Sequence, residues 1–257
     1  MSDTLQAILK RQLGVDSLEA VPNRYGPEGF CFSCAGVQAV GNWQRLRSLF
    51  ERTRCWPVIL GDDDEKDRVL EIAQSEFGQP YEQILKDSVA TTPEEWLSER
   101  EAGLLDDGSG RDTDEVRRSF HGSWPDRVDA LTQFTIPYGT LDRKPKQKVT
   151  MGLFAVQNSC EIPAVVNFGG WNDCPSPFAH VLMMRKWARE YGAELVGMSG
   201  DVVEMLVERP PQSRESALKL ATEQFLYCSD IVTQGAENIE SLAAALLGTK
   251  IWFFWWD

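Results

Sequence analysis

Long hydrophobic runs are missing from this chain of 257 residues. A membrane-spanning helix needs about 20 consecutive apolar residues, and no stretch approaches that length. The opening residues, MSDTLQAILKRQLG, also lack the basic and then apolar pattern of a secretory signal peptide. We therefore expect no membrane association and a cytoplasmic location.

Positive charge is scarce compared with negative charge. The chain has 26 Lys and Arg against 39 Asp and Glu, which gives a formal net charge of −13 at pH 7. Such a field repels the phosphates of nucleic acids and anionic lipid heads, and it attracts basic surfaces. We expect no nucleic-acid binding, and we expect any protein partner to be basic. The oligomeric state does not follow from the charge.

Residues that bind metals or carry redox chemistry are also few. The chain has six cysteines and two histidines. Six cysteines in a chain of this length are too few for a disulfide scaffold. Cys31 and Cys34 have the spacing of half a zinc site, but no second Cys-x-x-Cys exists, and His121 and His180 stand alone. The acids of GDDDEKDRVLEI, from Gly61, are consecutive, unlike those of a calcium loop, and they predict a helix start. We predict no metal site and no cofactor.

The N-terminal part of the chain predicts helices that lead into a sheet. Apolar residues at helical spacing within 5–13 predict an amphipathic helix, and Asn42 is a candidate cap for a second one. The segment WPVIL at 56–60 predicts a short buried strand. Thr92 and Glu95 have the spacing of a capping box, so a helix should follow them.

Two polar stretches suggest where the chain divides. The first is DDGSGRDTDE at 106–115, and the second is DRKPKQK at 142–148. The hydrophobic pattern becomes clearer after the second stretch. We therefore predict an N-terminal α/β segment over 1–148 and a C-terminal α+β domain over 149–257, packed against it.

The C-terminal part predicts an α+β fold with strands and helices in the order β-α-β-β-α-α-β. Gly200 and Asp201 predict a tight hairpin turn, and Ser213 predicts the start of a helix. This order resembles the split βαβ arrangement, a mixed and mostly antiparallel sheet with helices packed on it. The expected strands are VTMGLFAV and AVVNF, which together stand at the first β of this order, and then AELVGMS, VVEMLVE and KIWFFWWD. The expected helices cover 178–191, 213–227 and 238–247.

The last predicted strand has large apolar side chains on both faces. Ile251, Phe253 and Trp255 point one way along a strand, and the three residues between and after them point the other way. Such a strand should lie in the centre of the sheet, or the N-terminal segment should cover its second face. An exposed aromatic platform that stacks a base or a sugar is the alternative.

Four motifs of the C-terminal part carry a resemblance to a known family. The segments GGWNDCP, LVGMSGDVVEMLVERPP, QFLYCSDIV and IWFFWWD, all within 149–257, look like an uncharacterised bacterial family known only as a domain of unknown function. Many long members of that family have an N-terminal segment with a Trp-led helix and a short Pro-Val strand, to which NWQRLRSLFERTRCWPVILG is similar. The family has no assigned activity, so the resemblance implies a domain and no chemistry.

The stretch GGWNDCPSPFAH, at 169–180, is the candidate site. Cys174 lies at a helix start, where the helix dipole favours a thiolate, His180 could act as a base, and Asp173 could orient it. However, a helical wheel places His180 on the apolar side, and we do not expect the sequence to bring it to Cys174. The alternative is a packed turn, in which Trp171, Asn172 and Asp173 supply packing, local hydrogen bonds and any binding surface.

Two classes of function follow. The first is a non-catalytic, acidic, cytosolic protein-binding module that masks a basic partner such as a bacterial toxin domain, as an immunity protein does. Acidic surface near 62–67 or 106–115 would then bind the partner. The second is a cysteine-dependent hydrolase or transferase that uses Cys174 and His180. Charge and the absence of a complete catalytic motif favour the first class.

Overall fold

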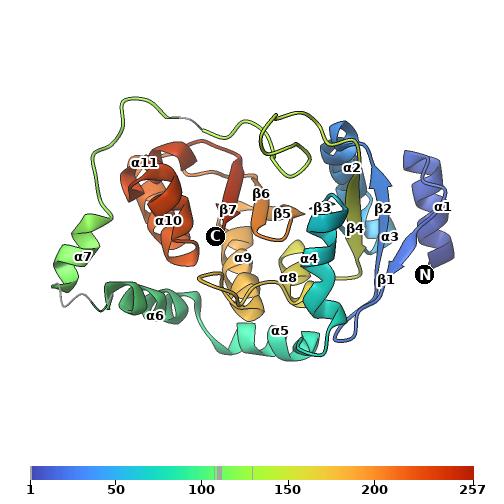
Figure 1. Cartoon of the computed structure of the whole chain (residues 1–257), viewed down its shortest axis with the longest axis horizontal. Helices are drawn as coiled ribbons and strands as arrows, with labels where there is room; N and C mark the ends of the chain where they lie inside the picture. The colour runs from blue at the N-terminus through green and yellow to red at the C-terminus, as the bar shows by residue number, and fades with distance from the viewer. Residues whose placement is uncertain (1, 107, 109–111, 129) are drawn as a thin grey trace. The chain divides into compact units, whose positions relative to one another are not determined.

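A computed structural model of the chain describes residues 2–106, 108, 112–128 and 130–257 (Figure 1). Its strands form a mixed sheet in the order β1-β2-β4-β3-β5-β6-β7, with helices packed on it, so the fold class is α+β as predicted. None of the helices in these ranges is long and apolar enough to cross a bilayer.

Two compact units divide the chain, and each draws on separate parts of the sequence. The first unit comprises Met1–Leu85, Phe134–Phe168 and Leu195–Glu204. The second comprises Lys86–Gln133, Gly169–Glu194 and Met205–Asp257. The boundary expected near residue 148 lies inside the first unit.

The sheet of the first unit is centred on β4 (Val149–Phe154). All six residues of this strand are buried, and it pairs antiparallel with β2 (Gly29–Cys34) on one side and β3 (Trp56–Gly61) on the other. Strands β2 and β3 are therefore parallel, and with α2 between them in sequence they form a split β-α-β unit. Strand β1 (Glu19–Val21) extends the sheet beyond β2, and β5 (Ala193–Met198) pairs parallel with β3.

Helices of the first unit begin mostly where their caps predict. Helix α1 (Ser2–Leu13) is followed by Gly14 at φ +70°, and Asp62 caps α4 (Asp63–Gln74) in a capping box with Glu65. The expected cap at Asn42 is wrong. Helix α2 (Gly36–Ser48) begins six residues before Asn42, so Asn42 lies within the helix. Its side chain forms a hydrogen bond with the Cys34 thiol. Helix α3 (Phe50–Thr53) and α5 (Tyr81–Ala90) complete the N-terminal helices up to residue 90.

The segment AVVNF is not a strand. After η1 (Ser159–Glu161), residues Ile162–Val166 form the short helix α8. Pro163 occupies the first turn, where its fixed φ fits a helix and its missing N–H costs no hydrogen bond. Asn167 ends the helix in the left-handed conformation at φ +54°. A short apolar run does not distinguish a buried strand from a buried helix, which is why the sequence misled here.

The second unit consists of helices around a strand of aromatic residues. Helices α10 and α11 pack together, and α6 packs against both α9 and α10 (Figure 1). Its elements are α6 (Pro93–Leu105), α7 (Thr113–Ser119), α9 (Pro177–Tyr191), α10 (Arg214–Tyr227), the π-helix η2 (Ile231–Ala236), α11 (Ile239–Leu246) and β7 (Ile251–Trp255), and β6 (Val202–Val207) ends in it. The predicted caps at Thr92 and Ser213 are confirmed.

Strand β7 lies at the end of the sheet order, not in its centre as one expectation had it. Only one of its faces is fully buried, because Ile251, Phe253 and Trp255 are half-buried while the alternate residues are inaccessible. The ring of Phe254 stacks on Trp187 of α9 at 5.4 Å. Its apolar second face borders a groove to which residues of 125–128 and Leu131, from the expected N-terminal segment, contribute, so that face is only partly covered.

Candidate functional site

The GGWNDCPSPFAH stretch folds into a tight turn that needs its glycines. Gly169, Gly170 and Asn172 have φ values of +103°, +87° and +45°. A side chain on Gly169 would place its Cβ 2.0 Å from the carbonyl oxygen of Pro175, so only glycine fits there. The amide of Gly170 donates to that same oxygen at 3.0 Å, which holds the turn against the start of α9.

This turn brings Cys174 and His180 into contact, contrary to our expectation. The Sγ atom of Cys174 lies 3.5 Å from Nε2 of His180, and Nδ1 of His180 lies 2.5 Å from the hydroxyl of Tyr227. The helical wheel correctly placed the imidazole on the buried face of α9. It missed the contact because the left-handed residues before Cys174 fold the chain back over the first turn of the helix.

The protonation states of the cluster oppose nucleophilic chemistry. Cys174 is 5% exposed, and both His180 and Tyr227 are 0% exposed. Burial lowers the pKa of His180 to about 3, and burial raises the pKa of the Cys174 thiol far above its ordinary value. At neutral pH both groups are therefore uncharged. A reactive cysteine needs a lowered pKa and access to its substrate, and Cys174 has neither.

Asp173 does not orient the imidazole. Its carboxylate accepts hydrogen bonds from Arg100 Nη2 at 2.6 Å and from the Ser229 hydroxyl at 2.8 Å. The same Arg100 donates through Nε to the carbonyl of Leu226 at 3.1 Å. Asp173 therefore ties the turn to α6 and to the end of α10, which is a structural role.

The two other residues predicted to bind a partner differ in exposure. Asn172 is exposed, and its amide donates to the main-chain carbonyl of Asp257 at 2.7 Å. Trp171 is half-buried. The turn is thus hydrogen-bonded to Asp257, and its polar side chains are largely used in contacts within the chain.

The cysteine pair of β2 shows no metal geometry. Cys31 is buried and Cys34 is half-buried, and both are free thiols. Within the described part of the chain, no group of three or more His, Cys, Asp or Glu side chains is placed to hold a metal ion.

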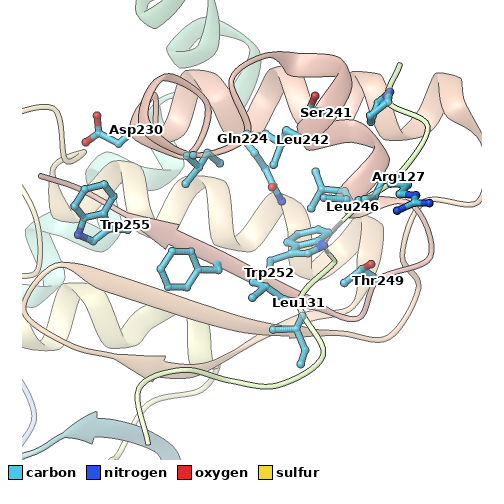
Figure 2. Close-up of a pocket in the computed structure, with 18 residues that line it drawn as sticks. Arg127, Leu131, Gln224, Asp230, Ser241, Leu242, Leu246, Thr249, Trp252 and Trp255 are labelled. Atoms are coloured by element: carbon cyan, nitrogen blue, oxygen red, sulfur yellow. The ribbon is translucent and has the colours of Figure 1, made fainter. Parts of the chain in front are cut away.

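A groove in the second unit is a site that the sequence analysis did not identify (Figure 2). It has a volume of about 420 Å³ and runs along β7, between η2 and α11 on one side and residues such as Arg127 and Leu131 on the other. Its walls are mainly apolar, and Gln224 of α10 and Trp252 of β7 contribute side chains to it. Gln224 could have been noticed from the sequence, because it is a polar residue on the apolar face of α10.

The comparisons with known proteins give one match, which covers the turn and most of the residues that line the groove. Residues 150–257 match DUF4253, a domain of unknown function. No curated protein and no solved structure matches the chain significantly.

The DUF4253 region contains most of both candidate sites. Cys174, His180 and Tyr227 lie within it, as do Gln224 and Trp252. Two arginines of these sites lie outside the matched residues: Arg100, which is bonded to Asp173, and Arg127, which lines the groove. The match covers β4 but neither β2 nor β3, the strands with which β4 pairs.

Proposed function

We propose that this protein is a non-catalytic binding protein whose partner is a basic protein. The observation that carries the proposal is a surplus of exposed carboxylates on α6, α7 and the residues between them. Among the described residues of that stretch, the exposed cations are Arg117 and Arg118. The exposed carboxylates are those of Glu94, Glu95, Glu99, Asp106, Asp112, Asp114 and Glu115. We call this set the α6–α7 acidic surface.

The other acidic segment considered, 62–67, is less suited to a partner because most of its carboxylates are already paired with lysines. Lys148 bonds Asp63 at 2.7 Å, and Lys146 bonds both Asp62 and Glu65. Part of the 106–115 segment, residues 107 and 109–111, lies outside the described residues. The carboxylates in the described part of that segment belong to the α6–α7 acidic surface.

The net charge of −13 supports the same partner class. A strongly negative protein attracts a basic one over a distance of about one Debye length, ~8 Å at physiological salt, and speeds their encounter. Masking a basic toxin domain, as an immunity protein does, is the specific role we propose. Such a role needs complementary charge and no chemistry.

The alternative, a cysteine-dependent hydrolase or transferase, has one observation in its favour. Cys174 and His180 are in contact, as a nucleophile and its base would be. Their burial, their neutral forms and the engagement of Asp173 with Arg100 favour a structural cluster instead. We therefore rank this alternative second.

The test is to purify partners from the source organism on the full-length protein and to measure association rates at increasing salt. We expect a stoichiometric basic partner whose association rate falls about tenfold between low and high salt, because exposed charges are screened. A rate that does not depend on salt, or a partner without basic character, contradicts the proposal.

Two charge variants locate the binding surface. The test variant replaces four carboxylates of the α6–α7 acidic surface with amides, at Glu94, Glu99, Asp112 and Glu115. The control variant makes the same change of net charge at four exposed glutamates of the first unit, Glu28, Glu51, Glu71 and Glu76. We expect the test variant to slow association more than the control does. Equal effects mean that only net charge matters.

A further inference from the structure

The groove along β7 contains two buried hydrogen-bond donors that have no acceptor. They are the amide nitrogen Nε2 of Gln224, a residue 1% exposed, and the indole nitrogen Nε1 of Trp252, a residue 0% exposed. No hydrogen-bond partner for either atom is found among the described residues. Buried polar groups in native proteins are nearly always paired, so an acceptor from outside the chain is the expected complement.

Other buried indoles of this chain illustrate the usual arrangement. The Nε1 atom of Trp43 donates to the carbonyl of Pro57 at 3.0 Å. In the second unit, Nε1 of Trp187 donates to Glu223 at 3.2 Å. The fold therefore can supply acceptors to indoles at this depth. It does not do so where Trp252 meets the groove.

The remainder of the groove defines what kind of molecule could bring the acceptor. Ile231, Leu242 and Phe253 give it apolar walls. Its charged lining residues are Arg127, which is exposed, and Asp230, and Figure 2 shows them at opposite ends. Asp230 is already engaged, since it accepts hydrogen bonds from the backbone amide of Asp257 and from Gln234.

The chemistry of the donors selects the ligand. In Figure 2 the amide of Gln224 points toward the indole of Trp252, which lies between it and the Arg127 end of the groove. Two N–H donors and a nearby guanidinium match a carboxylate, whose oxygens only accept hydrogen bonds. A volume of about 420 Å³ is within the usual range for small-molecule sites.

We infer that this groove binds a small carboxylic acid with an apolar body, with its carboxylate on Gln224 Nε2 and Trp252 Nε1 and its apolar part along Phe253 and Ile231. The inference is independent of the proposed protein partner, since it concerns a different surface of the second unit. It assigns no reaction to the site.

The test is a titration of the full-length, ¹⁵N-labelled protein with octanoate, observed through the indole N–H signals. Trp252→Phe identifies the signal of Trp252. We expect this signal to move and saturate with octanoate, while the Trp43 signal stays in place. Octylamine, which has the same apolar chain but no acceptor of this kind, should not reproduce the movement, although the negative protein attracts it.

A matched pair of variants tests the contribution of the amide. Gln224→Leu removes the buried donor and keeps the side chain's volume, and we expect it to weaken octanoate binding about tenfold or more. Gln212→Leu makes the same change at an exposed position before α10 that does not line the groove, and it should leave binding unchanged.

Three results overturn the inference. The first is an unmoved Trp252 signal at millimolar octanoate, which means that no acceptor of the ligand reaches the indole. The second is equal binding of octylamine and octanoate, which means that the groove recognises only the apolar chain. The third is unchanged affinity in a folded Gln224→Leu protein. The comparison of the two ligands needs no variant, so it stands even if Gln224→Leu fails to fold.

Discussion

The Sγ atom of Cys174 and the Nε2 atom of His180 lie 3.5 Å apart, and both residues are almost completely inaccessible to solvent. In an active site, such a contact would activate the thiol. Here the imidazole is neutral, and its other nitrogen faces the hydroxyl of Tyr227. The contact therefore contributes to a polar cluster within an aromatic core.

We expect Cys174 to react slowly with iodoacetamide at neutral pH in the folded protein. Its thiol is buried and its pKa is raised, whereas Cys34 is half-buried and should be modified first. Mass spectrometry of the alkylated protein measures both rates, and addition of denaturant should equalise them. Fast, selective modification of Cys174 would place the hydrolase hypothesis first.

Cys174→Ser should lower the free energy of unfolding by about 1–3 kcal/mol, because a smaller and more strongly hydrated group replaces a buried thiol. Cys34→Ser, at a half-buried position of β2, is the control and should change stability by less than about 0.5 kcal/mol. Urea unfolding of the two variants gives the comparison. Similar losses in both would show that the cluster has no special packing role.

His180 should make the protein less stable as the pH falls. Its folded pKa of about 3 lies below the ordinary value of 6.5, so the unfolded chain binds the proton first. The contribution is complete above pH 6.5 and is lost as the pH falls from there toward 3, with a slope of about 1.4 kcal/mol per pH unit. Unfolding of wild type and His180→Gln across this range measures the slope.

The control for this pH dependence is His121→Gln. His121 is exposed and bonded to Glu240, so it does not share the buried environment of His180. We expect the His121→Gln protein to keep the wild-type slope between pH 6.5 and 4. If both variants flatten the curve equally, the buried imidazole is not its source.

Phe254→Ala should destabilise the protein by about 3–5 kcal/mol, because it leaves a cavity in a packed aromatic core. Phe254 is 0% exposed and contacts both Trp187 and Tyr227. The neighbouring Phe253 is half-buried on the groove side, so Phe253→Ala should cost much less. Thermal unfolding measures the loss of stability in each alanine variant. Deletion of residues 251–257 should abolish the cooperative unfolding transition. Equal losses from the two alanine variants would contradict one-sided burial.

A fragment of residues 149–257 should fail to unfold cooperatively. It retains β4, whose six residues are all buried, but it lacks β2 and β3, which pair with both edges of that strand. Unpaired edges and exposed apolar side chains favour aggregation. Calorimetry of the fragment beside the full chain tests this, and a sharp transition in the fragment would support an independent C-terminal domain.

The sequence was sufficient where local interactions decide the structure. Asp62, Thr92 and Ser213 each cap a helix, because a side-chain oxygen satisfies an amide a few residues away and needs no tertiary partner. The same holds for the hairpin turn at 200–201 and for the strand at 251–255, whose alternating aromatics follow from the period of a strand.

Only the tertiary structure decided features that depend on distant residues. The burial of β4 depends on strands more than 80 residues earlier in the chain, and no local pattern could place β7 at the end of the sheet. The contact of Cys174 with His180 depends on the positive φ values of Gly169, Gly170 and Asn172. Glycine and asparagine allow such values, but their presence in the sequence does not require them. The unpaired donors of Gln224 and Trp252 became visible only once packing showed which buried groups had found an acceptor. Pairing across the chain is a property of the packed core, and a sequence read locally contains only one partner of each pair.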